Sequence, residues 1–333
     1  MTIRRVDPAD DAEMREYQRL YELAERAEMP DAVAYTLDDA VTVLSRPSLG
    51  SRYEGYAAFE GGRMVGEGMI VCSIEDNLDR ARMWVWVPPA ERNRGVGCEL
   101  VEFLVDRCRE LGRTVLQSTT TCPPDAGPDH PHRRFAARHG FSRANVQIER
   151  RLILPVPDER LDRLASQAAP HHRDYTLRTV VGQIPADLAQ GYVGVQNQLG
   201  LDAPAGDLRV EKGRRTADGL ADQDRELLAQ GRTRLTVFAL DAAGTVVGFT
   251  CAVPTGGEEP HVDQRGTIVR RADRGHRLGL ALKVAGVREI QRRFPAKRFV
   301  STVNAETNAP MAAVNEALGF TPYAIEDDLQ RIL

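Results

Sequence analysis

The sequence predicts an α+β (mixed α/β) protein made of two similar domains in tandem. Its 333 residues are enough for about two domains. The segment VPPAERNRGVG at residues 87–97 returns, in the same frame, as VRRADRGHRLG at residues 269–279. Strand-like and helix-like segments follow one another in the same order around both copies. An internal duplication explains these observations, and we expect each domain to be a twisted mixed sheet of about six to seven strands flanked by helices.

The first half begins with a strand at residues 2–6 and a helix at residues 11–27, which has apolar residues at helical spacing after an acidic start. A paired Gly61-Gly62 between two apolar runs predicts a hairpin. The remaining elements are expected in this order: a helix at 37–44, the hairpin at 53–71, a strand at 81–87, a helix at 97–111, a strand at 114–120, a helix at 133–140 and closing strands through 154.

The second half repeats this order. Its expected elements are a strand at 175–180, helices at 185–199 and 217–230, a hairpin at 234–253, a strand at 266–272, a helix at 278–293, a strand at 298–305, a helix at 308–318 and a strand at 325–333. Between the halves, PVPDERLDRLASQAAP looks like a linker with a short helix. We therefore expect domains at 1–155 and 174–333, joined by a linker at 156–173.

Composition narrows the function classes. The formal charge is −4, so no global positive field favours nucleic acid or an anionic membrane. The five cysteines are widely spaced and form no C-x-x-C, so neither a disulfide framework nor a zinc site is indicated, and we expect no metal. No apolar run approaches the ~20 residues that span a bilayer, and the first residues lack the apolar core of a signal peptide. We expect a cytoplasmic protein.

The repeated loop has the chemistry of an anion site. A strand, a glycine-containing turn and a helix start are expected in succession, and the first helix amides lack intrahelical acceptors. Gly95 and Gly97 remove side chains that would block a phosphate, and Arg92 can close over the anion as a fork. The segment therefore favours a pyrophosphate cradle; a plain tight turn is the alternative.

Two other phosphate-binding motifs do not fit. A Walker loop needs G-x-x-x-x-G-K-[ST], which is absent from the sequence. A Rossmann fingerprint needs three glycines after the first strand of a parallel unit, whereas this loop follows an expected antiparallel hairpin.

The first copy, with Val87, Pro89, Arg92, Gly95 and Gly97, resembles the V-x-P-x-x-R-x-x-G-x-G loop of the GCN5-related N-acetyltransferases (GNAT). The family's companion signature, a helix ending in GF about 45 residues later, is present as FAARHGF and VNEALGF. The chain is thus similar to tandem acetyltransferases such as mycothiol synthases and proteins of actinomycete antibiotic pathways. The resemblance implies acetyl-CoA as co-substrate.

The resemblance also implies where acetyl-CoA binds: pantetheine along the strand before each loop and the diphosphate on the loop amides. The implied residues are, in the first half, Val85, Trp86, Val87, Arg92, Asn93, Arg94, Gly95, Val96 and Gly97, and, in the second, Thr267, Ile268, Val269, Arg274, Gly275, His276, Arg277, Leu278, Gly279, Asn304 and Asn308. The second loop departs from the pattern, with Arg271 at the position of Pro89 and Arg277 at that of Gly95. Arg277 either leaves the site open or fills it.

Acetyl transfer needs a neutral amine, a held thioester carbonyl and a proton for the leaving thiolate. Many family members use a carboxylate on the strand before the loop and a tyrosine four residues before the GF glycine. Ala136 and Asn315 replace that tyrosine here. His261 and Asp263 precede the second loop and would share a strand face. This pair is the better candidate for the base, and a solvated hairpin mouth at EEPHVD is the other interpretation.

Asn304, Asn308 and Asn315 form a second candidate group. Asn308 suits a helix N-cap, and Asn315 lies on roughly the same helix face, from which it could donate to pantetheine or to the thioester oxygen. The catalytic candidates are therefore Asp263, His261 and Asn315. His130 and His132 lie in a Pro/Gly-rich loop and give no firm metal motif.

The sequence thus predicts an acetyl-CoA-dependent N-acetyltransferase that acts on the primary amine of a small polar metabolite. The alternative is an acetyl-CoA-binding sensor or scaffold with one or both domains silent; protein lysine acetylation is a weaker third possibility. We expect a small-molecule amine as acceptor, no nucleic acid or membrane partner, and a monomeric pseudo-dimer or a weak homodimer.

Overall fold

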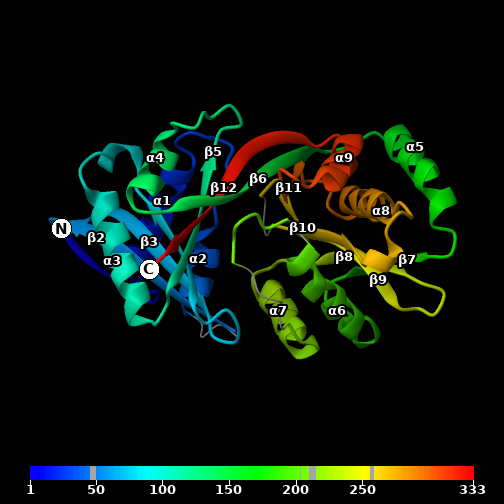
Figure 1. Ribbon diagram of the computed structural model, residues 1–333, viewed down its shortest axis with the longest axis horizontal. Coiled ribbons are helices and arrows are strands. Elements are labelled where there is room, and N and C mark those ends of the chain that lie inside the picture. The colour runs from blue at the N-terminus through cyan, green and yellow to red at the C-terminus, as the bar shows by residue number, and fades with distance from the viewer. Residues whose placement is uncertain (46–49, 203, 210–214, 256–258) are drawn as a thin grey trace. The chain divides into compact units, whose positions relative to one another are not determined.

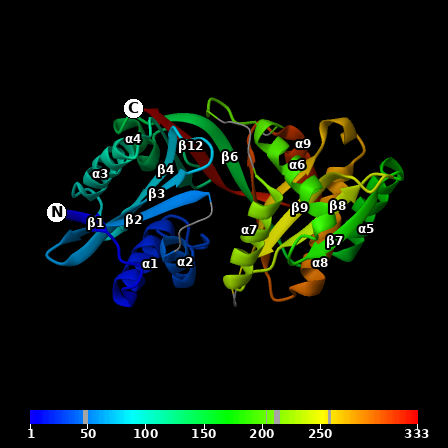
Figure 2. The same cartoon turned by 90° about the horizontal axis from the view of Figure 1, so that it is seen from below.

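The structure is a computed structural model that describes residues 1–333 except 46–49, 203, 210–214 and 256–258. Its residues fall into two compact units. In both, helices cover the two faces of a sheet (Figures 1 and 2). The first unit comprises Met1–Val146, Gly206–Leu208 and Ile325–Leu333, and the second comprises Gln147–Ala205 and Arg209–Ala324.

The elements of the first half follow the predicted order. They are β1 (Thr2–Arg5), α1 (Asp11–Glu25), α2 (Leu37–Ser45), β2 (Ser51–Glu60), β3 (Arg63–Ser73), β4 (Arg80–Trp86), the 3-10 turn η1 (Pro89–Glu91), α3 (Val96–Glu110), β5 (Val115–Cys122), α4 (Pro131–Arg138) and β6 (Ser142–Ile153).

The second half repeats this order after a short helical connection. Its elements are α5 (Asp158–Ala168), η2 (Ala169–His171), β7 (Thr176–Val181), α6 (Ala186–Asp202), α7 (Ala217–Ala229), β8 (Leu235–Leu240), β9 (Val246–Pro254), β10 (His261–Val269), η3 (Arg271–Asp273), α8 (Leu278–Arg293), β11 (Phe299–Ala305), α9 (Ala309–Leu318) and β12 (Thr321–Ile332). The predicted mixed α/β fold class is confirmed.

Each unit has a mixed sheet with one parallel junction. In the first unit the order is β1-β2-β3-β4-β5-β12, and β4 and β5 are the parallel pair. In the second unit the order is β7-β8-β9-β10-β11-β6, and β10 and β11 are the parallel pair. The other pairings within each unit are antiparallel, so each repeated loop follows a strand that has an antiparallel neighbour on one side and a parallel neighbour on the other.

The two units do not follow the expected domain ranges 1–155 and 174–333. Each sheet takes its last strand from the other range. In the first unit, β5 pairs with Ile325–Ile332 of β12, at the end of the chain. In the second unit, β11 pairs with Gln147–Ile153 of β6. Figure 1 shows β6 and β12 as two long curved strands. The alternation of apolar residues along the sequence cannot predict this exchange, because hydrogen bonding between strand backbones depends little on which strand is the partner.

The expected linker at 156–173 also takes part in the second unit. It forms α5, whose Leu161, Leu164 and Ala168 are buried in the core cluster that contains α8. These side chains recur at helical spacing, so the helix has a continuous apolar face. The helical part of the segment is therefore packed against the core, whereas residues 169–171 and 173 are exposed.

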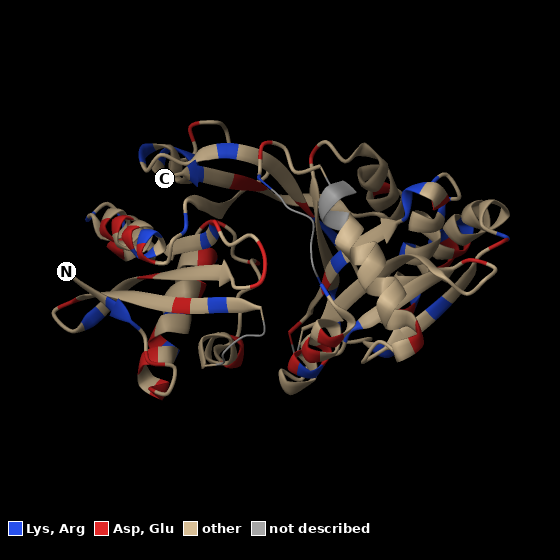
Figure 3. Ribbon diagram, turned by 60° about the horizontal axis from the view of Figure 1, so that its bottom comes forward, with Lys and Arg blue, Asp and Glu red and all other residues tan. Residues whose placement is uncertain are grey.

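The cores lie between the sheets and their helices. In the first unit α3 covers one sheet face with Leu100, Val101 and Leu104, and α1 covers the other with Met14 and Tyr17. Among the described helices none combines the length and the apolar character needed to cross a bilayer. Figure 3 shows acidic and basic residues interspersed over both units.

Candidate active site

The first loop joins β4 to α3 and contains two residues with positive φ. Asn93 has φ 61°, and Gly95, the N-cap of α3, has φ 88°. No side chain caps α3, so its first amides are left for another acceptor. A Cβ built at Gly95 would meet nothing within 4 Å. Uncapped amides beside open space are what an anion site at a helix N-terminus requires.

The second loop repeats this geometry despite its different sequence. Gly275 has φ 90° and Arg277, the N-cap of α8, has φ 52°; they occupy the positions of Asn93 and Gly95. No side chain caps α8 either. The Arg277 guanidinium donates to the backbone carbonyl of Gln167 in α5, 3.2 Å away. Arg277 thus preserves the backbone turn, at a conformational cost of about 1–2 kcal/mol.

The loop arginines brace their loops. Nε of Arg92 donates to the carbonyl of Val87 at 3.0 Å, and Nε of Arg274 donates to that of Val269 at 3.1 Å. Arg92 also pairs with Glu28 at 3.2 Å. The expected fork over the anion is therefore not the arrangement seen, because the guanidinium of Arg92 already has partners at the strand end and in the segment after α1.

Other implied cofactor residues contribute backbone rather than side chains. Val96 and Leu278 are buried at their helix starts, and Arg94 pairs with Glu60 at 2.6 Å. The ring of His276 donates to the carbonyl of His171 at 3.2 Å. The hydroxyl groups of Thr267 and Thr250 lie 2.7 Å apart. Any anion bound by these loops would therefore depend chiefly on backbone amides.

The parallel strands separate close to both loops. β4 pairs with β5 only at Arg80–Arg82, and β10 pairs with β11 only at His261–Asp263. Beyond these pairs the strands keep only their outer, antiparallel partners. The segments Val85–Val87 and Thr267–Val269 lie in the diverging parts. An extended ligand could pair there with strand backbone and reach the loop amides.

β10 differs from β4 in carrying a β-bulge. Its register with β9 shifts between Gln264 and Gly266, directly after its pairing with β11 ends at Asp263. A bulge bends its strand and leaves one residue unpaired, here Arg265. Arg265 donates from Nε to Asp263 at 3.1 Å. The bulge thus helps to turn β10 away from β11.

His261 and Asp263 lie on one face of β10, as expected. In the register they stand opposite Phe299 and Ser301 of β11. Nε2 of His261 lies 2.6 Å from Oγ of Ser301, and Nδ1 has no partner in the described structure. Burial, with Arg151 and other cations nearby, lowers the pKa of His261 to about 4. His261 is therefore neutral at pH 7, whereas the side chain of Asp263 is 44% exposed.

Asn315 belongs to a different group, on the other face of the sheet. Nζ of Lys283 donates to its Oδ1 at 2.6 Å, and its Nδ2 donates to Oδ1 of Asn304 at 2.7 Å. Asn304 is an odd number of residues from Ser301 along β11, so the two side chains point to opposite faces. The structure thus separates Asn315 from His261 and Asp263. Asn308 caps α9, accepting from the amide of Met311.

Lys283 is a site residue that the sequence analysis missed. It is 1% exposed, and burial together with the charge of Arg150 lowers its pKa to about 7. By the 182-residue offset of the two loops it corresponds to Val101, and by alignment of the two GF helices, which are 179 residues apart, Asn315 corresponds to Ala136; both Val101 and Ala136 belong to an apolar core cluster. The second unit has therefore replaced an apolar contact by a polar one. The signal was a lone lysine in the apolar run LGLALKVAGV.

Glu67 of β3 was missed as well. It is 1% exposed, its Oε2 has no partner, and burial, with the nearby Glu25 charge, raises its pKa well above the usual value. It pairs across the strands with Trp86, whose Nε1 donates to Glu25 at 2.6 Å. Aromatic rings gather around this position, namely Tyr17, Tyr21, Tyr35 and Trp84. A buried carboxyl with a raised pKa, among aromatic rings and beside a cofactor loop, is a candidate acid or base.

Comparison with known proteins supports the fold and gives a family match for part of the first half. Residues 14–141 match the model of the acetyltransferase (GNAT) family. Residues 14–141 form a GNAT domain. Over the whole chain, a tandem GNAT protein from the clavulanic acid biosynthesis pathway is similar, with 25% identity, a TM-score of 0.77, and coverage of 99% of this chain and 98% of that one. The chain has the architecture of a tandem GNAT protein.

Two further solved structures share the fold. A GCN5-related N-acetyltransferase from Sphaerobacter thermophilus has 18% identity and a TM-score of 0.67, with 99% and 95% of the two chains covered. A glucosamine N-acetyltransferase region of a fungal multi-domain β-N-acetylglucosaminidase has 14% identity and the same TM-score, with 99% of this chain and 38% of that chain covered. No curated protein sequence matches the chain.

The GNAT family transfers acyl groups from acyl-CoA, and the chain is accordingly an acyltransferase. The family match covers the first loop, residues 87–97. The second loop lies outside that match but has the same pair of positive-φ positions, the same arginine brace and the same diverging strands.

Proposed function

We propose that the chain transfers an acetyl group from acetyl-CoA to the primary amine of a small polar metabolite, with the amine attacking the thioester directly. The observation that supports this most is the pair of matching loops, each with an uncapped helix N-terminus beside a diverging parallel strand pair. Such a site can hold a diphosphate and an extended amide-containing arm together. We place the reaction in the cytoplasm, with neither nucleic acid nor membrane as a partner.

Acetyl-CoA would be held mainly by backbone. The amides of residues 93–97 and 275–279 would bind the diphosphate. The strand segments Trp84–Val87 and Gly266–Val269 would pair with the amides of pantetheine. The thioester would then lie toward the point where the strands part, at Arg82 in the first unit and Asp263 in the second.

In the second unit, Asp263 is the proposed base for the attacking amine. It stands where β10 and β11 separate, and its partial exposure would let it reach an incoming ammonium group. His261, two residues away on the same face, is neutral; its Nδ1 is buried without a partner and would position the acceptor only after it is uncovered. A carboxylate that takes a proton from the amine generates the nucleophile that the reaction needs.

Asn315 and Lys283 are the proposed source of a proton for the leaving thiolate in that unit. The pKa of about 7 lets Lys283 exchange a proton near neutral pH. Asn315 stands where many family members have a tyrosine, and its amide retains one N–H beyond the bond to Asn304. In this step the ammonium form of Lys283 would give its proton directly to the thiolate and become the neutral amine, while the remaining N–H of Asn315 would donate a hydrogen bond to the sulfur.

In the first unit, Glu67 is a second candidate for acid–base chemistry. Its counterpart by the repeat offset is Phe249, which is buried in an apolar cluster. The two units have therefore specialised in different ways. The acceptor pocket of the first unit would be lined by aromatic rings beside Glu67.

The proposal is tested by release of free CoA thiol when the full chain is incubated with acetyl-CoA and a library of small amines. Thiol release that depends on one amine supports transfer, and the acetylated product should appear in equal amount. Asp263→Asn and Glu67→Gln then report which unit carries the chemistry. The absence of amine-dependent release across the library would contradict transfer to small amines.

The alternative function is acetyl-CoA binding without transfer, as a sensor or scaffold. Both positions of the family tyrosine are occupied by other residues, Ala136 and Asn315, and Oδ1 of Asn315 is engaged by Lys283. Saturable acetyl-CoA binding with no product from any amine would favour this alternative. Sedimentation with and without acetyl-CoA would test the proposed monomeric pseudo-dimer against a weak homodimer.

A further inference from the structure

An arginine of the second unit is buried without a counter-charge. Arg150 of β6 is 8% exposed, and neither its Nε nor its Nη1 has a hydrogen-bond partner in the described part of the chain. A guanidinium stays protonated in a protein, so this side chain keeps its positive charge. A buried charge without a partner is strongly unfavourable. A buried polar group of this kind is typical of a site whose partner is a ligand or a reacting group.

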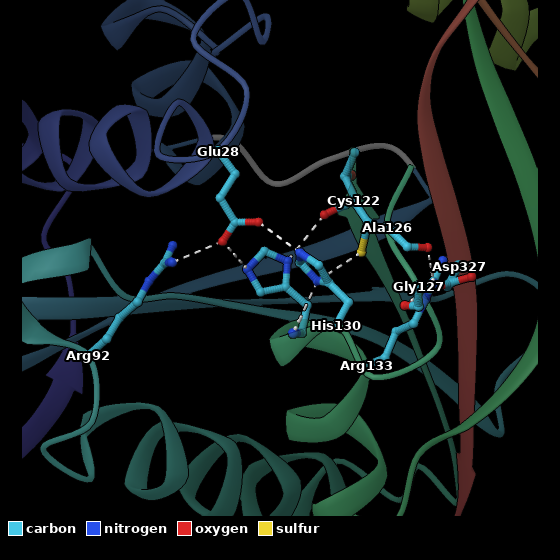
Figure 4. A network of polar contacts seen from close by, with 10 residues as sticks. Glu28, Arg92, Cys122, Ala126, Gly127, His130, Arg133 and Asp327 are labelled. Carbon is cyan, nitrogen blue, oxygen red and sulfur yellow. Dashed lines mark hydrogen bonds and ion pairs between the residues drawn. The ribbon is translucent and has the colours of Figure 1, made fainter. Parts of the chain in front are cut away.

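Arginines beside the first cofactor loop are paired with carboxylates instead. Arg92 pairs with Glu28 at 3.2 Å, and Arg133 pairs with the buried Asp327 at 2.5 Å. Figure 4 shows each of these guanidinium groups directed at its carboxylate. Arg150 has no such partner among the described residues. The packing of the chain therefore accounts for the charges of Arg92 and Arg133 but leaves that of Arg150 unexplained.

Arg150 shares a sheet face with the proton donor proposed for the second unit. In the register of β6 and β11, Arg150 stands opposite Thr302, and Asn304 follows two residues later in β11. Such diagonal neighbours lie on one face and within reach of a long side chain. Asn304 accepts from Asn315, which accepts from Lys283. Burial and the charge of Arg150 both lower the pKa of Lys283, so the guanidinium acts on this group.

The counterpart of Arg150 in the first unit is apolar. Thr302 is the first residue of β11 after its last parallel pair with β10, and Ser118 is the first residue of β5 after its last parallel pair with β4. Arg150 stands opposite Thr302. Leu329 of β12 stands opposite Ser118, and it is buried in an apolar core cluster. Leu329 therefore occupies the position of Arg150.

Three positions have become polar together in the second unit. They come from three different elements, and in the first unit they pack in one apolar cluster. In the first unit they are Val101, Ala136 and Leu329, and in the second they are Lys283, Asn315 and Arg150. Each polar residue in a core is unfavourable by itself, so three that meet at one place are typical of a functional site.

The sulfur of CoA is the group that becomes anionic beside these residues. The pantetheine arm proposed for the gap between β10 and β11 would enter beside Thr302, the residue opposite Arg150. Acetyl-CoA carries no charge at its thioester end, whereas the carbon–sulfur bond leaves its electron pair on sulfur when it breaks. A fixed cation without a partner in the ground state gains one only as this charge develops. Such an arrangement stabilises the transition state more than the bound substrate.

We therefore propose, resting on the acyl-CoA site of the proposed function, that Arg150 is a catalytic residue of the second unit and donates hydrogen bonds to the CoA sulfur as it becomes a thiolate. Arg150 keeps all of its protons throughout. The ammonium of Lys283 gives the proton that neutralises the sulfur, and no group is oxidised or reduced. The first unit, with Leu329 at this position, lacks the charge.

The test measures the ionisation of CoA bound to the full chain. CoA and desulfo-CoA, which lacks the sulfur, are bound in parallel samples. The ultraviolet difference spectrum between them shows the thiolate band as the pH is raised across the range in which thiols ionise. We expect one bound CoA per chain to reach half-ionisation at a pH at least about one unit below that of free CoA in the same buffer.

Variants assign this shift to Arg150. Arg150→Gln should remove it, and Arg150→Lys, which keeps the charge, should retain part of it. Arg178→Gln is the matched control, because Arg178 is an exposed arginine on β7 of the same unit, and it should behave as the wild type does. For an amine whose acetylation depends on Asp263, Arg150→Gln should lower kcat about 100-fold and leave the KM for acetyl-CoA within about twofold.

Two bound CoA molecules with unshifted thiols would overturn the role of Arg150 and leave acyl-CoA binding by the second unit intact. A shift of equal size in the wild type and in Arg150→Gln would also overturn it, because the charge would come from another group. Binding of a single CoA that Gly279→Glu does not affect would overturn both this role and the proposed function of the second unit. Circular dichroism checks the fold of each variant. If Arg150→Gln is unfolded, Arg150→Leu replaces it, because leucine is the residue of the first unit at this position.

Discussion

Nζ of Lys283 donates to Oδ1 of Asn315 across 2.6 Å, and neither side chain is more than 1% exposed. A buried amine of this kind is costly unless it is neutral or well bonded. Burial and the charge of Arg150 lower the pKa of Lys283 to about 7. Because Lys283 is buried with a lowered pKa, the stability of the second unit should depend on pH. By our proposal, the same lysine takes part in acetyl transfer.

We predict that Lys283→Met removes a pH dependence of stability. The folded pKa of about 7 lies below the ~10.4 of an unfolded lysine, so between these values the unfolded chain binds the extra proton. The free energy of unfolding of the wild type should therefore rise with pH across this window, by at most about 1.4 kcal/mol per pH unit. Urea unfolding at pH 7, 8 and 9 measures the slope.

Lys283→Met should flatten that slope relative to the wild type. Arg288→Met, on the exposed side of α8, is the matched control and should retain the wild-type slope. Equal slopes in wild type and Lys283→Met would show that Lys283 is not the titrating group.

We predict the opposite pH dependence for Glu67. Because its folded pKa is raised, Glu67 in the folded chain releases its proton at a higher pH than in the unfolded chain, where the pKa is about 4.3. The wild type should therefore lose stability as pH rises above about 4.3, until the folded carboxyl also ionises, and Glu67→Gln should not. At pH 7 the variant should be the more stable by roughly 1–3 kcal/mol. Chemical denaturation at pH 4.5 and 7 checks this, and a variant less stable than the wild type at pH 7 would contradict it.

We predict that Asp263→Asn lowers turnover at least about 100-fold, the lower end of what a general base contributes. The partly exposed side chain has one salt bridge, to Arg265, so the fold should survive the change. Acetyl-CoA affinity should stay within about twofold of the wild type, because the loop amides are untouched. Steady-state kinetics and calorimetry together measure the two effects. Unchanged turnover would remove Asp263 as the base.

The sequence was sufficient for the element order and for both loops, because helix and strand periodicities are local and the loop pattern recurs in register. It also showed that Arg277 stands in the second loop where the first loop has Gly95. Only the structure shows that this arginine adopts the positive φ of 52° there. The exchange of the last strands was not predictable, since Gln147–Ile153 and Ile325–Ile332 are both plausible last strands for either sheet.

The site was predicted less completely than the fold. His261 and Asp263 share a strand face because side chains alternate along a strand, which is a local rule. Lys283 meets Asn315 across 32 positions, and Glu67 gains its surroundings from helix α1 and strand β4. Such contacts come from tertiary packing. The available signal was the single charge of Lys283 in an apolar run. It predicts that the lysine is buried, but it does not predict which residue it contacts.

The most direct test of the account is calorimetric titration of the intact chain with acetyl-CoA, compared with Gly279→Glu and its uncharged match Gly279→Gln. A Cβ at Gly279 meets nothing within 4 Å, so neither change should disturb the backbone, while the carboxylate would repel a diphosphate. We predict two sites in the wild type, one site in Gly279→Glu, and two in Gly279→Gln. A wild type that binds a single equivalent, unaffected by Gly279→Glu, would contradict the claim that both loops are acetyl-CoA sites.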